Sequence, residues 1–340
     1  MARKKQFKTE MISDKDGIRF ATPEPVAQYR AKRLQCKTIA DISCGIGGQA
    51  LFFAKYCDFV YAIEIEPKKI AFAKKNAKMM GIDNIEFIAG DALSSEVIEK
   101  LPQLDVVFSD PARPPAEKER SIDNLSPSIP EVMKTYAGIS SNFAFEAPPQ
   151  LSPEKIPFDC EREYMSLEGK LNRLNLYFGE LKKADVSAVA LPGSNIIRKA
   201  GTFEPAKKVK EPALYAYEPE ECVIRSGLLE QLVAELKKEA NDVAIFGVDG
   251  KRILLTSGFE IDNTLFKNIY KKMLICEANF SKINSFLKKN SFGKVIVRAA
   301  IDPEKYWDVR NELENGLDGE RKAHLFVKDE KAIVFEVLDH

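Results

Sequence analysis

The sequence has few of the residues from which metal sites and disulfide frameworks are built. It contains two histidines and six cysteines in 340 residues, and no two cysteines form a CxxC pair. Structural zinc sites need four such ligands at short spacings, and disulfide frameworks are typical of small secreted chains. We therefore predict no metal site, and we expect the cysteines to be small buried apolar residues.

Long apolar runs are also missing. No segment approaches the roughly 20 apolar residues that a membrane helix needs, and the start MARKKQFKTE lacks the apolar core of a signal peptide. We therefore expect a cytoplasmic protein that does not bind membranes. Basic and acidic residues balance at 51 each, so the net charge neither requires nor excludes a polyanionic partner.

The apolar content, 45% of the residues, is enough for two domains. In the first half, four β-rich segments alternate with helical stretches such as 68–81; they are 38–42, 59–65, 85–90 and 104–110. This alternation predicts an α/β domain with a Rossmann-like, doubly wound parallel sheet. Two later strands are expected, in REYMSLEG and DVSAVALPG.

A polar, basic segment without periodicity, 198–212, predicts a linker and a domain boundary near residue 210. We expect a basic N-terminal segment at 1–20, a first domain with this linker at 21–210, and a smaller α+β domain at 211–340. The second domain is predicted to contain helices at 226–240 and around 280–290, a strand at 294–301, and a C-terminal pair of strands.

A glycine-rich turn, CGIGG, follows the first predicted strand. Glycines let the backbone approach a ligand closely, and open α/β sheets bind nucleotides at the carboxyl ends of their strands. Gly45, Gly47 and Ala50 fit the spacing of a dinucleotide site, and Glu64 could hold ribose hydroxyls of either a dinucleotide or S-adenosylmethionine. The turn alone does not separate these two ligands.

Polar residues at the other strand ends favour S-adenosylmethionine, which has no pyrophosphate and needs its amino acid, ribose and adenine held at successive strand ends. Asp41 lies ahead of the glycines, where a carboxylate can bind the ammonium group. Asp91 follows the third strand, where it could bind the amine of an adenine or instead cap the next helix. Cys44, in the glycine turn, is a further cofactor-binding candidate.

The fourth predicted strand ends in FSDPARPP. An acidic or amide residue followed by proline recurs at this place in methyltransferases that act on amino groups. Asp110 and the carbonyl of Pro111 can accept hydrogen bonds from the acceptor nitrogen and so turn its lone pair toward the sulfonium methyl group. The alternative is that Asp-Pro only starts a turn after the strand.

With these motifs the chain resembles class I S-adenosylmethionine-dependent methyltransferases that carry a C-terminal THUMP-like domain. The resemblance spans almost the whole chain after residue 20 and rests on five segments: ATPEPVAQYRAKRL, DISCGIGGQAL, SDPAR, EYMSLEG and YEPEECVIRSGLLEQL. The first half is also similar to the trimethylguanosine synthase group, which methylates the exocyclic amine of guanosine in RNA. The resemblance implies a cofactor site at Asp41, Gly45, Gly47, Glu64 and Asp91, with Asp110 and its proline facing the acceptor.

The chain departs from the pattern after this proline. Where many amino-methyltransferases have a second proline and a base-stacking aromatic residue, it has Ala112 and Arg113. Arg113 can stack on a base, pair with a phosphate, or order the loop by pairing with a carboxylate. Farther upstream, Thr22 is expected to cap the helix that follows, and the resemblance places that helix beside the cofactor, which makes Glu24 a further candidate.

The second domain contains a basic stretch, 271–299, with seven lysines and arginines against one glutamate and with interleaved phenylalanines. Such a stretch suits an RNA surface, or it is a solvated lysine face over core phenylalanines. The candidates for substrate binding are Lys288, Lys289, Lys294 and Arg298.

We therefore predict an S-adenosylmethionine-dependent methyltransferase that modifies a base nitrogen, an exocyclic amine, of structured RNA such as tRNA or rRNA. The alternatives are a non-catalytic RNA-binding protein that keeps the fold, and a methyltransferase acting on a protein or a small molecule. A NAD-dependent dehydrogenase is disfavoured because the SDPAR strand end would have no role in it.

Overall fold

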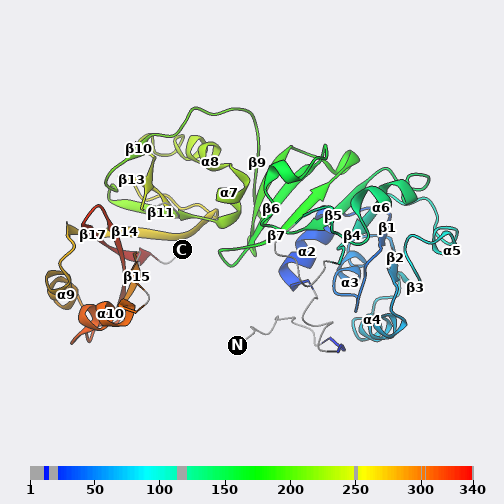
Figure 1. Ribbon diagram of the computed structural model, residues 1–340, viewed down its shortest axis with the longest axis horizontal. Coiled ribbons are helices and arrows are strands. Elements are labelled where there is room, and N and C mark those ends of the chain that lie inside the picture. The colour runs from blue at the N-terminus through cyan, green and yellow to red at the C-terminus, as the bar shows by residue number, and fades with distance from the viewer. Residues whose placement is uncertain are drawn as a thin grey trace. The chain divides into compact units, whose positions relative to one another are not determined.

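The structure, a computed structural model, describes residues 11–14, 22–112, 121–248, 252–299, 301–302 and 304–338 (Figure 1). The chain divides into two compact units, Met1–Lys199 and Ala200–His340. The division lies before the boundary predicted near residue 210, because the short strand β10 (Lys208–Val209) pairs with β12 (Ala244–Gly247) of the second unit.

The first unit is built on a nine-stranded sheet in the order β3-β2-β1-β4-β5-β7-β6-β8-β9. The first five strands in this order are parallel to one another, as the alternation of strands and helices predicts. They are β1 (Thr38–Asp41), β2 (Phe59–Glu64), β3 (Ile85–Ala89), β4 (Val106–Ser109) and β5 (Phe143–Ala147). The Rossmann-like prediction is thus confirmed.

The sheet continues past β5 with strands that change direction. The hairpin β6 (Glu161–Leu167) and β7 (Lys170–Tyr177) adds antiparallel to β5, and β8 (Val186–Leu191) and β9 (Asn195–Arg198) extend the edge. Both late strands expected from the sequence, β6 and β8, are present. The helices of this unit are α2 (Glu24–Arg33), α3 (Ala50–Phe53), α4 (Pro67–Met79), α5 (Ser95–Ile98) and α6 (Ile129–Tyr136), with 3-10 turns η1 (Pro153–Lys155) and η2 (Gly179–Leu181).

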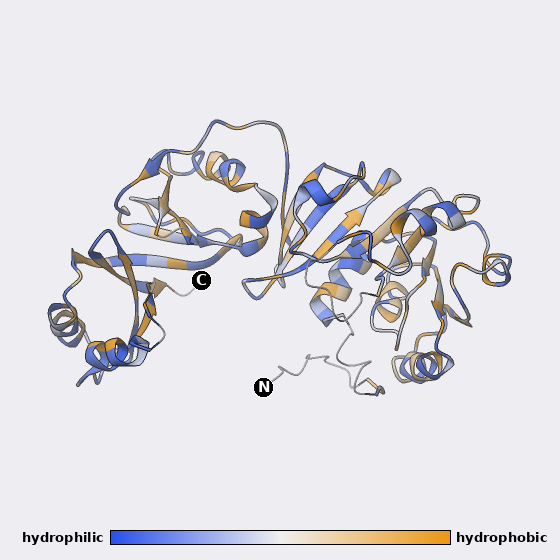
Figure 2. Ribbon diagram, in the orientation of Figure 1, coloured by the Kyte–Doolittle hydropathy of each residue, from blue (hydrophilic) through white to orange (hydrophobic). Residues whose placement is uncertain are grey.

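Hydrophobic residues of α2 and α3 pack against β1, β2 and β4 to form one core cluster. Helix α4 joins this core through a narrow stripe: hydrophilic and hydrophobic residues mix along it (Figure 2), and its buried positions recur at helical spacing, at Ile70, Ala73, Asn76 and Ala77. The glycine turn therefore connects two elements, β1 and α3, that both belong to this core.

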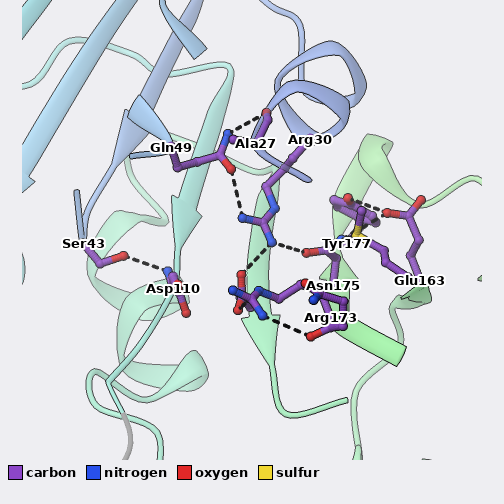
Figure 3. Close-up of polar contacts among 12 residues, drawn as sticks. Ala27, Arg30, Ser43, Gln49, Asp110, Glu163, Arg173, Asn175 and Tyr177 are labelled. Atoms are coloured by element: carbon purple, nitrogen blue, oxygen red, sulfur yellow. Dashed lines mark hydrogen bonds and ion pairs between the residues drawn. The ribbon is translucent and has the colours of Figure 1, made fainter. Parts of the chain in front are cut away.

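Helix α2 is attached to the sheet by buried polar contacts as well. The Arg30 side chain is 1% exposed; it pairs with Glu146 of β5 at 2.7 Å and donates hydrogen bonds to Gln49 at 3.0 Å and to Asn175 of β7 at 2.9 Å (Figure 3). Glu146 is also paired with Arg173 at 2.6 Å. These contacts join α2 to three other parts of the unit.

The start of α2 differs from the prediction. The helix begins at Glu24 with Pro23 as its N-cap and with no side-chain capping hydrogen bond, so Thr22 is not the cap. Thr22 is instead buried, and the fixed backbone of Pro23 and Pro25 sets the direction of the first turn.

The second unit has an eight-stranded sheet in the order β10-β12-β13-β11-β14-β17-β16-β15. The long strand β14 (Phe266–Glu277) lies inside it and pairs with β11 (Tyr215–Pro219) on one side and β17 (Lys331–Leu338) on the other. The other elements are α7 (Glu221–Ser226), α8 (Leu229–Leu236), β13 (Ile253–Ser257), α9 (Phe280–Lys289), β15 (Phe292–Arg298), α10 (Tyr306–Glu314) and β16 (Arg321–Lys328).

Most elements predicted for the second unit are present, and one boundary moves. The helix expected at 226–240 is preceded by α7, which Gly227 ends in a left-handed conformation with φ of 73°, so the longer helix begins at Leu229. Helix α9, strand β15 and the pair β16 and β17 lie where the sequence places them.

The Arg30 contacts generate a stability prediction. Arg30→Ala should lower the free energy of unfolding by about 3–5 kcal/mol, because it leaves the Glu146 carboxylate buried with less compensation. The control is Lys32→Ala, in the same helix but at an exposed position, which should change stability by less than about 0.5 kcal/mol. Urea unfolding followed by circular dichroism makes the comparison, and equal effects of both variants would contradict it.

Candidate active site

The glycine turn is held to the end of β2 by two backbone groups. Cys44 N–H donates to the Ile63 carbonyl at 3.0 Å, and Gly45 N–H donates to the Glu64 carboxylate at 2.9 Å. Gly45 and Gly47 have φ values of 56° and 90°, which glycine adopts without strain. A side chain at Gly47 would also press on Leu51. Two of the predicted cofactor residues, Gly45 and Glu64, are therefore in direct contact.

Glu64 is almost buried at the end of β2, with 9% of it exposed. One carboxylate oxygen accepts the bond from Gly45 and the other accepts Glu66 N–H at 3.0 Å. Each oxygen of an ionised carboxylate can accept about two hydrogen bonds, so both retain capacity for a ligand hydroxyl. Glu64 thus orders the turn and presents acceptors beside it.

Asp41 is the last residue of β1 and is 1% exposed. Its Oδ1 accepts Ser43 N–H at 3.2 Å, while its Oδ2 has no hydrogen-bond partner among the residues that the structure describes. Burial, reinforced by the carboxylates of Asp110 and Glu64, raises the pKa of Asp41 to about 7. A buried carboxylate oxygen of this kind fits a cationic ligand group, such as an ammonium.

Asp110 lies beside this aspartate because β4 is the neighbour of β1. Its backbone N–H donates to Ser43 Oγ at 2.7 Å (Figure 3), so the turn after β1 and the end of β4 are linked by one hydroxyl. Pro111 is buried, and Ala112 forms an antiparallel bridge with Ser126. Arg113 lies outside the described residues.

Asp91 is exposed after β3 and accepts Leu93 N–H at 2.9 Å in a tight turn. It does not cap the following helix: the N-cap of α5 is Ser94, whose side chain accepts Val97 N–H. The capping alternative for Asp91 is therefore wrong, and its exposed carboxylate lies at the same edge of the sheet as Glu64.

A cavity of about 490 Å³ lies between the segments 121–124 and 154–157, which follow β4 and β5. Asp123, Asn124, Glu154 and Lys155 line it with polar groups, and Ile122 contributes apolar surface. The Ala112–Ser126 bridge fastens the first segment to the loop that begins with Asp110. The volume is within the usual range of small-ligand sites.

Three residues of the site were missed by the sequence reasoning. Ile65 follows Glu64 with 65% of its surface exposed, an apolar group next to the ribose-binding candidate. Ser43 and Arg30 connect the candidates to one another and to the sheet. An exposed position for Ile65 could have been suspected from its place just past a buried strand, whereas the hydrogen bonds of Ser43 and Arg30 left no signal in the sequence.

The basic candidates of the second unit do not lie on one face. Lys288 and Lys289 are exposed at the end of α9, and Lys294 is exposed on β15. Val295 and Val297 of β15 pack against α9 in one core cluster, so the alternating Lys294 and Arg298 point to the other side of the sheet.

Arg298 is half-buried on β15. It interacts electrostatically with Glu218 and with buried His324, and it lowers the pKa of His324, which burial above all brings to about 4. Arg298 is therefore in a different environment from the exposed lysines.

Two kinds of feature are absent from the described residues. No group of three or more His, Cys, Asp and Glu side chains in that part of the chain could hold a metal ion. Within the same residues, no helix is both long enough and apolar enough to cross a membrane. All six cysteines are free; four are buried, and Cys36 and Cys276 are half-buried.

Comparison with known proteins adds the chemistry. The family model for RNA cap guanine-N2 methyltransferases matches residues 36–120. An uncharacterized S-adenosylmethionine-dependent methyltransferase of Mycobacterium tuberculosis is 22% identical over 85% of this chain and 78% of its own length.

Two shorter matches cover 22% of this chain each. The trimethylguanosine synthase of Schizosaccharomyces pombe is 45% identical over 80 residues, 33% of its length. A 23S rRNA uracil-C5 methyltransferase of Vibrio cholerae is 44% identical over 80 residues, 21% of its length. Both matches are too short to carry a substrate over to this chain.

A solved structure shares the fold. A candidate methyltransferase from Porphyromonas gingivalis superposes with a TM-score of 0.73 at 14% identity, over 96% of this chain and 83% of the other. The family model and the mycobacterial relative together support an S-adenosylmethionine-dependent methyltransferase with S-adenosylmethionine as its cofactor. They do not confirm the THUMP-like part of the resemblance, which stays a prediction.

The raised pKa of Asp41 generates a prediction about stability. The folded state holds the Asp41 proton up to about pH 7 and the unfolded state loses it near pH 4, so this residue destabilises the fold increasingly as the pH rises between these values. From pH 5 to pH 8 the loss is about 2–3 kcal/mol.

Asp41→Asn should remove this dependence. The amide has nearly the same shape and no charge, so the variant should unfold at a higher temperature than the wild type at pH 8 and show a smaller difference at pH 5. Thermal unfolding at the two pH values measures it. A variant that is destabilised equally at both would contradict the raised pKa.

Proposed function

We propose that the chain is a methyltransferase that transfers the methyl group of S-adenosylmethionine to an exocyclic amine of a base in RNA. The observation that carries this proposal is the hydrogen bond between Ser43 and the backbone of Asp110. This bond keeps the end of β4 next to the turn after β1. The end of β4 would orient the methyl acceptor, and the turn would bind the methyl donor. A dinucleotide-dependent enzyme needs no such neighbour at the end of β4.

The cofactor roles follow from position and charge. Asp41 would accept the ammonium group through its unpartnered oxygen, and Glu64 would accept the ribose hydroxyls. Gly45, Gly47 and Cys44 would supply the backbone of the turn, and Asp91 would accept the adenine amine. Ile65 offers an exposed apolar surface for one face of the adenine.

The acceptor roles belong to Asp110 and Pro111. When bound, the cofactor supplies an electrophilic methyl group, and the protein has to point a nitrogen lone pair at it. The Asp110 carboxylate and the Pro111 carbonyl can accept hydrogen bonds from the two hydrogens of an amine, which leaves the lone pair directed away from both. Arg113, two residues after Pro111, would contact the base or its phosphate.

RNA as the substrate rests on two kinds of support. The matched family model is described as that of RNA cap guanine-N2 methyltransferases. Exposed lysines at the end of α9 suit phosphates.

The experiment that tests the function uses S-adenosylmethionine with a labelled methyl group and total RNA. After incubation the RNA is digested and its nucleosides are separated by mass spectrometry. We expect label on an amine-bearing base. Label on C5 of uracil would overturn the acceptor assignment, and RNA that stays unlabelled would overturn the substrate.

Variants of Asp110 separate acceptor orientation from cofactor binding. Asp110→Ala should leave the affinity for S-adenosylmethionine within about twofold of the wild type and lower methyl transfer by about 100-fold or more, because orientation acts on the reacting geometry. Asp110→Asn keeps one oxygen acceptor and should retain part of the activity. The control is Asp105→Ala, at the exposed residue just before β4, which should change neither cofactor binding nor methyl transfer. Loss of cofactor binding in Asp110→Ala would make the residue structural.

The lysines of α9 can be tested apart from the strand residues. Replacing Lys288 and Lys289 together by glutamate should weaken RNA binding and reduce the slope of log affinity against log salt by about two, one for each lost phosphate contact. The matched control is the same change at Lys237 and Lys238, an exposed pair at the end of α8. Equal slopes for both double variants would mean that the α9 lysines are only solvated surface.

A further inference from the structure

Asn76 of α4 connects the glycine turn to the N-terminal part of the chain. Its side chain is 1% exposed, and its amide is fully engaged on the donor side: Nδ2 donates to the Ile46 carbonyl and to the Ile12 carbonyl, both at 3.0 Å. Its Oδ1 accepts Ile12 N–H at 2.8 Å. An asparagine amide has two donor hydrogens, so both are used by these two carbonyls.

Ile46 is the residue between the two left-handed glycines of the turn. Because glycines give the turn conformational freedom, a fixed partner for the Ile46 carbonyl limits the conformations in which the turn can rest. Asn76 is such a partner, and it belongs to a helix that is packed on the core. Its own orientation is fixed in turn by the two hydrogen bonds to Ile12.

The N-terminal residues also form an ion pair. Asp14 pairs with Lys68 at 3.5 Å, and the Lys68 side chain is 70% exposed. Exposed pairs of this kind contribute little, whereas the two Ile12 hydrogen bonds are made to a buried amide.

We infer that Asn76 is a positioning residue for the cofactor, through which residues 11–14 act as a strap that holds the glycine turn in its binding conformation. The inference rests on the proposed placement of the cofactor at this turn. With Ile12 docked, Asn76 is held in the rotamer that binds Ile46. Without it, the amide can turn away and the turn loses a fixed contact.

The coupling has to act in both directions. If the docked strap strengthens cofactor binding by some factor, the bound cofactor strengthens docking by the same factor. Addition of S-adenosylmethionine should therefore slow hydrogen exchange of the Ile12 amide, although residues 11–14 need not touch the ligand.

The test uses a proline to remove one hydrogen-bond donor. Ile12→Pro takes away the N–H that binds Asn76, whereas the control Ile12→Ala shortens the same side chain and keeps that N–H. Residue 12 lies outside helices and strands, and both variants are made in the full chain. Calorimetry with S-adenosylmethionine should give a Kd raised about fivefold for Ile12→Pro and less than about twofold for Ile12→Ala.

Combination with Asn76→Ala separates positioning from a general structural effect. If the strap acts through Asn76, Ile12→Pro should have almost no further effect on the Kd in the Asn76→Ala background. Independent, multiplying effects would overturn the inference, as would equal affinities of Ile12→Pro and Ile12→Ala. Lys68→Ala should leave the Kd unchanged.

The outcome is separate from that of the RNA experiment. The measurement is of cofactor binding alone, so failure to methylate RNA would overturn the proposed substrate and not the strap. A wild-type chain that does not bind S-adenosylmethionine would overturn both the cofactor site and the strap.

Discussion

The arrangement of the first unit depends on one buried guanidinium. Arg30 comes from α2 and contacts Gln49 at the start of α3, Glu146 on β5 and Asn175 on β7. Removing this charge from water is costly, and only partners that match its geometry offset the cost. The helix can therefore dock in one position on the sheet, where all of these partners are available together.

The same residue adjoins both halves of the candidate site. Gln49 ends the glycine turn and is held between Arg30 and the Ala27 carbonyl of α2. The guanidinium also lies over the ring of Phe108, 4.8 Å from its centre, two residues before Asp110. Displacement of α2 would thus disturb the cofactor turn and the acceptor strand at once. Glu146 and Asn175 of the sheet are therefore linked to the candidate site through Arg30, despite their separation in the chain.

The sequence predicts the parts of this arrangement that are local. The alternation of β-rich and helical segments predicts the parallel strands. A parallel sheet brings the carboxyl ends of its strands to one edge, and this places Asp41, Glu64, Asp91 and Asp110 at that edge. Contacts between distant residues were not predictable in this way. Arg30 and Glu146 are 116 residues apart, and no local pattern marks either as the partner of the other.

Local patterns also failed where two similar residues compete. Asp and Ser are both favoured as helix N-caps. Helix α5 begins at Ser95, so its N-cap is Ser94 and not Asp91. In the second unit, a count of lysines along 271–299 could not show that the strand alternation of β15 would turn Lys294 away from α9. The net charge of a segment does not tell on which face of a sheet or helix its charged side chains lie.

The charge balance at the sheet edge bears on the choice between the two ligands that the glycine turn allows. The Glu64 and Asp110 carboxylates raise the pKa of Asp41, and the Arg30 guanidinium lowers it. Arg30 is, however, already paired with Glu146. A pyrophosphate brought to this edge would add negative charge to a group of carboxylates. A ligand with a sulfonium and an ammonium group would instead lower the pKa of Asp41 and relieve the repulsion among the three acids. The destabilising burial of Asp41 is therefore understandable as part of a site that becomes electrostatically balanced only when a cation is bound.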